Sequence, residues 1–122
     1  MDFVAVGVGG ALGSVLRYLV SLLPFTVGFP LATFIVNFLG AVIIGFLSGF
    51  SVDRVSPRIM LLFKTGFCGG FTTFSTFSLE SFTLLEKGQY RLGVLYIGLS
   101  LICCLAGIFL GRLLASRLRV GA

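Results

Sequence analysis

Residues 66–80 read GFCGGFTTFSTFSLE, and this stretch decides how the chain folds. It lies inside a long apolar run, residues 59–85, yet it contains two adjacent glycines and five hydroxyl-bearing side chains. Each glycine in a helix interior costs roughly 1 kcal/mol relative to alanine. We therefore predict that the helix formed by this run is broken at Gly69-Gly70. The alternative is a glycine pair that only permits close helix packing.

The composition around this stretch is that of a membrane protein. Of the 122 residues, 57% are hydrophobic and 11% are charged, and the mean hydropathy is +1.15. A soluble domain carries about 25% charged residues, so lipid rather than water must cover this chain. The net charge of +5 does not indicate nucleic-acid binding, because the basic residues flank apolar runs and form no stripe with interleaved aromatics.

Four apolar runs are long enough to cross a bilayer, which requires about 20 helical residues. The fold class we predict is an all-α membrane protein, with one transmembrane domain over residues 1–122 and helices at residues 3–23, 31–52, 59–85 and 92–117. Residues 53–58 form the plainest loop. No basic stretch precedes the first run, so we expect it to remain as a helix rather than be cleaved as a signal peptide.

Each run contains two glycines four residues apart, a spacing that lets helix backbones approach closely and predicts a compact bundle. These pairs are Gly9 and Gly13, Gly45 and Gly49, Gly66 and Gly70, and Gly107 and Gly111. The three cysteines, Cys68, Cys103 and Cys104, also fall within apolar runs. We expect them to be buried, inert thiols rather than a disulfide framework.

An even number of spans places both termini and the loop at residues 53–58 on one face. That face collects six basic residues, Arg54, Arg58, Lys64, Arg112, Arg117 and Arg119, whereas the opposite face has Arg17, Lys87 and Arg91. Basic residues favour the cytoplasmic side, so the excess indicates cytoplasmic termini. Because the excess is modest, insertion in either orientation is conceivable.

Several residues suit the conduction of a small anion. Phe74 and Phe77 lie three apart and share one helix face, so their electropositive ring edges could line a path, although ordinary packing is the alternative. Asn37 is the only asparagine. It either joins helices or faces a polar path, where its NH₂ can donate to an anion. Tyr96 and Ser100, four apart, share a face of the fourth helix, where local capping of a carbonyl is the alternative.

Residues 66–80, together with GSVLRY at residues 13–18 and TFIVNFLG at residues 33–40, closely resemble the Fluc (CrcB) fluoride-channel family. The resemblance covers essentially the whole chain. It implies an antiparallel homodimer inserted in dual topology in the bacterial inner membrane, with two narrow fluoride pores. It also implies a central, structural sodium ion at the dimer interface.

The resemblance also implies roles for individual residues. Pore positions fall on Asn37, Phe74, Phe77, Tyr96 and Ser100; the sodium ligands correspond to the backbone carbonyls of Gly69 and Thr72; Arg17 and Glu80 match positions near the pore entrances. Cys104 stands where the polar track of the fourth helix is expected to carry a hydroxyl, and a thiol is a weaker donor.

The function we expect is a fluoride-selective channel that passively exports cytoplasmic fluoride. A stripped ion pays heavily in a dry pore unless donors replace its water. One alternative is a small proton-coupled multidrug exporter, which needs a membrane-embedded carboxylate; Glu80 is the sole acidic candidate within a span. Another is a structural subunit, in which Asn37→Asp or Phe74→Ile would leave function intact. With no histidine and no hydrolase or nucleotide motif, we do not expect an enzyme.

Overall fold

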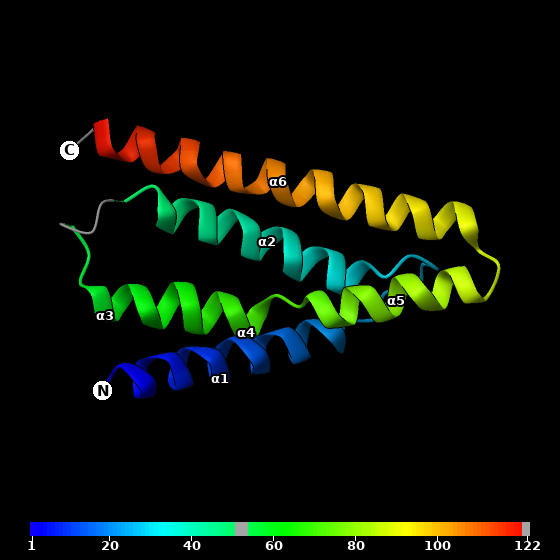
Figure 1. Cartoon of the computed structure of the whole chain (residues 1–122), viewed down its shortest axis with the longest axis horizontal. Helices are drawn as coiled ribbons and strands as arrows, with labels where there is room; N and C mark the ends of the chain where they lie inside the picture. Colours follow the sequence, from blue (N-terminus) through cyan, green and yellow to red (C-terminus); the bar gives the residue numbers. More distant parts are fainter. Residues whose placement is uncertain (51–53, 121–122) are drawn as a thin grey trace.

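The computed structural model describes residues 1–50 and 54–120, and all regular structure within them is helical. The elements in chain order are α1 Asp2–Ser21, α2 Leu31–Ser48, α3 Pro57–Met60, the π-helix η1 Leu61–Cys68, α4 Gly69–Phe71, α5 Phe74–Glu86 and α6 Tyr90–Val120. Because α3, η1 and α4 follow one another directly, they form a single third helix. After the two residues between α4 and α5, α5 continues along the line of this third helix, and α1, α2 and α6 run beside it (Figure 1).

Three helices, α1, α2 and α6, are long and apolar enough to cross a membrane, judged by length and composition in the part of the chain that is described. The prediction of an all-helical, multi-pass chain is thus confirmed. The start of α1, the end of α2, the start of α3 and the end of α6 lie at one end of the bundle, and the turn between α5 and α6 lies at the other (Figure 1).

The helix ends differ from the predicted ones by a few residues. The second helix ends at Ser48 with Gly49 as its C-cap, so it is shorter than the predicted residues 31–52. Residues 51–53, which include the end of that prediction and the start of the predicted loop, lie outside the described residues. The third helix begins earlier than expected, because the Ser56 side chain caps it by accepting from the Arg58 backbone N–H at 3.3 Å.

Helical geometry is lost between α4 and α5, although not at the predicted place. Gly69 is helical, with φ −62° and ψ −37°, so the position predicted from the glycine pair is wrong. Thr72 (φ −89°, ψ 158°) and Thr73 (φ −151°, ψ 119°) are instead the extended residues. We call Thr72 and Thr73 the extended segment.

The glycine pairs lie where helices touch. A Cβ atom at Gly9 of α1 would lie 2.9 Å from the backbone nitrogen of Phe67 in η1. A Cβ atom at Gly45 of α2 would lie 2.8 Å from the Cα of Ile108 in α6. Both distances are shorter than a real Cβ contact, so these backbones approach as closely as they do only because the side chain is absent. The prediction that these glycines permit close packing is confirmed.

A small aromatic core ties α5 to α6 near their connecting turn. Phe77, Leu84 and Tyr96 are buried there and pack against Phe29 and other half-buried apolar side chains. The Tyr96 ring meets that of Phe29 edge to face, with centroids 5.2 Å apart, an arrangement that favours aromatic pairs. Most other large apolar side chains of α1 and α6 are exposed, as expected of surfaces covered by lipid.

Candidate functional site

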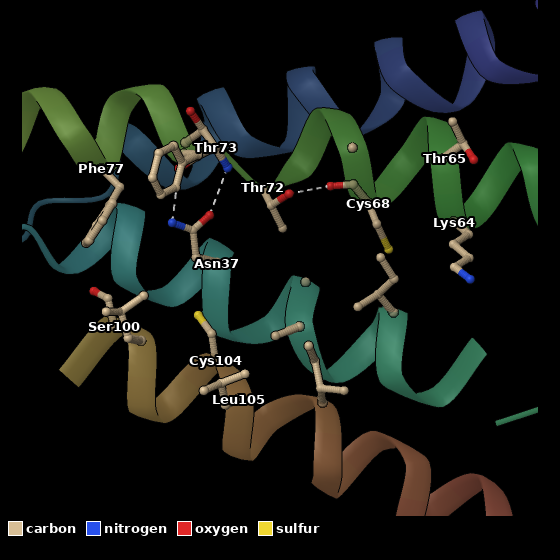
Figure 2. Close-up of a pocket in the computed structure, with 17 residues that line it drawn as sticks. Asn37, Lys64, Thr65, Cys68, Thr72, Thr73, Phe77, Ser100, Cys104 and Leu105 are labelled. Carbon is tan, nitrogen blue, oxygen red and sulfur yellow. Dashed lines mark hydrogen bonds between the residues drawn. The ribbon is translucent and has the colours of Figure 1, made fainter. Parts of the chain in front are cut away.

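A cavity of about 610 Å³ lies between α2, the third helix and α6 (Figure 2). Its lining is mostly apolar, with polar groups at a few positions. The residues used below are Asn37, Lys64, Gly69, Thr72, Thr73, Phe74, Phe77, Ser100 and Cys104. Six of these residues were predicted from the sequence as pore or sodium positions: Asn37, Gly69, Thr72, Phe74, Phe77 and Ser100. Cys104 is the predicted departure from the polar track of the fourth helix. Lys64 and Thr73 were not predicted as site residues.

Asn37 binds the extended segment through both ends of its side-chain amide. Its Nδ2 donates to the Thr73 carbonyl at 3.1 Å, and its Oδ1 accepts from the Thr73 N–H at 2.8 Å. The dashed lines in Figure 2 mark this pair. The amide thus gives the Thr73 N–H the acceptor that a continuous helix would supply, and it adds a donor to the Thr73 carbonyl, which as the N-cap carbonyl also begins the hydrogen bonds of α5. These two hydrogen bonds give the Asn37 amide partners in an otherwise apolar helix, and they hold its side chain beside the cavity.

The Thr73 hydroxyl caps the N-terminus of α5. It accepts from the Thr76 N–H at 3.2 Å, which is the usual bond of an N-cap residue, and it donates to the Thr76 hydroxyl at 3.1 Å. In a continuous helix, the Thr73 N–H would bond to the Gly69 carbonyl and the Thr76 N–H to the Thr72 carbonyl. Both donors are engaged elsewhere, so the carbonyls of Gly69 and Thr72 have lost their helical partners.

Arg17 binds the third helix from α1. Its Nε donates to the Gly70 carbonyl at 2.9 Å, and this carbonyl would accept from the Phe74 N–H if the helix continued. Arg17 lines a second cavity, of about 300 Å³, together with Thr33, Thr73 and Thr76. Thr73 lines both cavities, so a route between them would pass the Asn37–Thr73 pair.

Glu80 lies away from the larger cavity, among other polar groups. Its two carboxylate oxygens accept from the Thr33 hydroxyl at 2.5 Å and from the Tyr96 hydroxyl at 3.3 Å. Tyr96 has no exposed surface, and it does not belong to the described lining of either cavity. The structure therefore places Tyr96 beside Glu80 in the aromatic core, apart from the cavity wall on which Ser100 lies.

The two phenylalanines after the extended segment differ sharply in burial. Phe74 is 76% exposed and Phe77 is 8% exposed, although both line the cavity. Their ring centroids lie 5.7 Å apart and their planes meet at 43°. Phe77 is held by the Tyr96 ring, at 5.2 Å between centroids, whereas Phe74 presents most of its surface outward.

Ser100 and Cys104 lie one turn apart on α6 and face α2 across the cavity (Figure 2). Ser100 is 5% exposed, and its hydroxyl has no hydrogen-bond partner among the described residues. Hydroxyls in helices commonly bond to a carbonyl one turn earlier, as Ser81 does to Phe77 at 2.7 Å. A buried hydroxyl left without such a bond is rare, and this one belongs to a residue of the cavity wall.

Three contributors escaped the sequence analysis as site residues. Thr33 lies one turn before Asn37, a spacing that places both on one face of α2, and Thr73 precedes Thr76 by the three residues of an N-cap pattern. Both signals were present in the sequence. Lys64 lines the larger cavity near its α3 end (Figure 2), and no local pattern distinguishes it from a residue that faces lipid headgroups.

Comparison with known proteins places this geometry in context. Residues 4–112 match a family model described as CrcB-like protein, Camphor Resistance (CrcB). Curated relatives named "Fluoride-specific ion channel FluC" align over nearly their whole length. The Chlorobaculum tepidum protein is 52% identical, covering 90% of each chain. The Azobacteroides pseudotrichonymphae protein is 48% identical, covering 89% of this chain and 91% of the relative. The Methanococcus maripaludis protein is also 48% identical, covering 92% and 93%.

Proposed function

The chain belongs to the CrcB family, and we propose that it is a fluoride-specific ion channel, as the names of its curated relatives state for those proteins. It is a multi-pass membrane protein and not an enzyme. Its place would be the bacterial inner membrane, where it would let cytoplasmic fluoride leave passively, down its own gradient.

The observation that carries the proposal is the Asn37–Thr73 pair at the edge of the cavity. Fluoride must exchange its water for other donors in order to cross an apolar region. Asn37 Nδ2 uses one hydrogen on the Thr73 carbonyl and has a second to offer. The unpartnered Ser100 hydroxyl lines the same cavity. Such scattered, neutral donors bind an anion strongly enough to admit it and weakly enough to release it.

The rings of Phe74 and Phe77 would contribute their edges to this path. An aromatic edge carries partial positive charge, so it attracts an anion without the tight hold of a full charge. Lys64, the single charged residue in the described cavity lining, would add positive potential at one end. Chloride, being larger, would be excluded by the width of the path.

A second copy of the chain would complete the site. Phe74 is 76% exposed, and the space around a Cβ atom at Gly69 is open for 4 Å. An exposed aromatic ring beside open, glycine-lined backbone suits a partner better than lipid. In an antiparallel, dual-topology homodimer the two-fold axis would repeat each contact, so two equivalent pores would result. The excess of basic residues on one face is modest, six against three, which is compatible with insertion in either orientation.

Sodium would sit where the backbone oxygens of the extended segment meet those of the partner. The carbonyls of Gly69 and Thr72 fit this role, because the amides that would bond them in a helix are engaged by Asn37 and by the Thr73 hydroxyl. Hard cations bind such oxygens. One chain offers two of them, so a four-oxygen site would need both subunits. The bound ion would be structural and would raise the local potential for anions.

Fluoride efflux from liposomes tests the proposed function. Purified protein is reconstituted into liposomes loaded with either fluoride or chloride, and release is followed with an ion-selective electrode after a potassium ionophore is added. Fluoride should leave rapidly and chloride should not. Efflux of neither ion, or equal efflux of both, would refute the proposal.

The multidrug-exporter alternative gains nothing from the structure. Glu80, the carboxylate that it would require, is hydrogen-bonded to Thr33 and Tyr96 and lies outside the described lining of both cavities. A drug-proton exchange assay on the same liposomes should therefore give no signal.

A further inference from the structure

Two adjacent cysteines on α6 differ in what they face. Cys103 and Cys104 are both half-buried and both are free thiols. Cys104 lines the larger cavity, whereas Cys103 does not belong to its described lining. In Figure 2 the Cys104 sulfur extends from α6 towards α2, on the side where Asn37 lies. The chain thus carries a thiol on the cavity wall and a neighbouring thiol that is not part of the described lining.

Ser100 gives an independent sign that this wall accepts a ligand. It precedes Cys104 by one helical turn, which places both side chains on the same face of α6. Its hydroxyl is buried without a partner among the described residues, whereas Ser81 and Thr83 on α5 donate to the carbonyls one turn before them at 2.7 and 2.8 Å. The α6 wall therefore presents a hydroxyl and a thiol, both lacking a described partner, to one space.

We propose that Cys104 is a binding site for soft, thiol-seeking metals such as mercury(II), and that its occupation blocks the fluoride path. The site rests on the proposed function only for its effect on conduction. Thiolate sulfur is the preferred ligand of soft metals, and Cys104, unlike Cys103, belongs to the described lining of the cavity. Cys68 lines the cavity too, but it is 1% exposed, so its sulfur is shielded.

Methylmercuric chloride is a suitable probe because it is small and neutral, and a neutral reagent enters an apolar cavity without the cost of burying a charge. In the reaction, the Cys104 S–H bond and the Hg–Cl bond break and an S–Hg bond forms. A proton and a chloride ion are released, and nothing is oxidised or reduced. The product carries an apolar methylmercury group on the wall opposite Asn37, where it would close a path only wide enough for a small ion.

The experiment measures fluoride efflux from liposomes containing the full chain, before and after methylmercuric chloride, with each variant's rate expressed relative to its own untreated rate. Wild-type efflux should fall to that of protein-free liposomes, and a dithiol should restore it. Cys103→Ala protein should conduct like wild type and be blocked like wild type. Cys104→Ser and Cys104→Ala proteins should keep their own rates after treatment.

Block that persists in both Cys104 variants would overturn the proposal, and so would full conduction by wild-type protein whose Cys104 carries mercury in peptide mass spectrometry. If no variant conducts fluoride before treatment, the proposed function fails instead. The site is then judged by the adduct in the folded protein. Mercury on Cys104 with Cys103 unmodified supports it, and the reverse pattern overturns it.

Discussion

Replacing Asn37 by leucine removes both hydrogen bonds to the extended segment. Leucine has the same number and branching of side-chain heavy atoms, so the change removes both hydrogen bonds and leaves the half-buried Thr73 N–H without a partner, while the Thr73 carbonyl keeps its role as the N-cap carbonyl of α5. Hydrogen bonds between helices in membranes average about 0.6 kcal/mol each, and an orphaned buried backbone group costs about 1–3 kcal/mol. We expect the free energy of unfolding to fall by about 2–4 kcal/mol and fluoride efflux to be lost.

Asn37→Asp separates the two bonds. Its carboxylate can still accept from the Thr73 N–H, but it cannot donate to the Thr73 carbonyl, and it adds a negative charge to an anion path. Because that charge would lie in an apolar, half-buried site against the Thr73 carbonyl, the loss of stability should be at least as large as for Asn37→Leu, and efflux should be lost as well. Unfolding is measured in detergent and efflux in liposomes.

Gln89→Leu is the control, because it removes an amide from an exposed position in the turn between α5 and α6 and should change stability by no more than about 0.5 kcal/mol. Wild-type stability and wild-type efflux in Asn37→Leu protein would refute the reasoning, because the extended segment would then not depend on the amide.

Two further predictions concern packing and charge. Gly45→Ala should lower the free energy of unfolding by about 1–3 kcal/mol, because the new Cβ atom would lie 2.8 Å from the Ile108 Cα. Gly98→Ala is the control and should be neutral or stabilising, because the space around its Cβ position is open. Equal destabilisation by both changes would contradict the packing argument. Lys64→Gln should slow fluoride efflux by about threefold at low ionic strength, and the difference should close at high salt while Lys64→Arg stays near wild type; a salt-independent difference would show that Lys64 acts through packing.

The four helices could be predicted because bilayer thickness fixes the length of an apolar span and the runs are separated by polar or proline-containing segments. The glycine spacing likewise predicted correctly where helices pack, because close contact between helix backbones requires small residues at the contact positions. The predicted packing role is confirmed at Gly9 and Gly45, and also at Gly70 of the pair Gly66 and Gly70, where a Cβ atom would lie 2.9 Å from the Ser14 hydroxyl. The break predicted at Gly69-Gly70 is wrong in position, because both glycines are helical.

The remaining features depend on partners far along the chain, which no local pattern reveals. Asn37 reaches Thr73 across 36 residues, and Thr33 reaches Glu80 across 47. The sequence places Tyr96 on one helix face with Ser100 but does not show that its ring contacts those of Phe29 and Phe77; its place in the pore stays a prediction. The π-helical geometry of η1 was also missed, because its wider turn leaves the hydrophobic pattern of a short segment almost unchanged.

Three hydrogen bonds from separate neighbours hold the extended segment. Asn37 of α2 takes the Thr73 N–H, the Thr73 hydroxyl takes the Thr76 N–H, and Arg17 of α1 donates to the Gly70 carbonyl. Re-forming a continuous helix would require all three to be released, because each removes one partner from the same turn of the hydrogen-bond ladder. Each of these hydrogen bonds contributes about 1 kcal/mol to the free energy that holds the segment extended. Together they hold the extended segment against re-formation of a continuous helix, and in the proposed fluoride path donors fixed in this way would need no rearrangement as each ion passes.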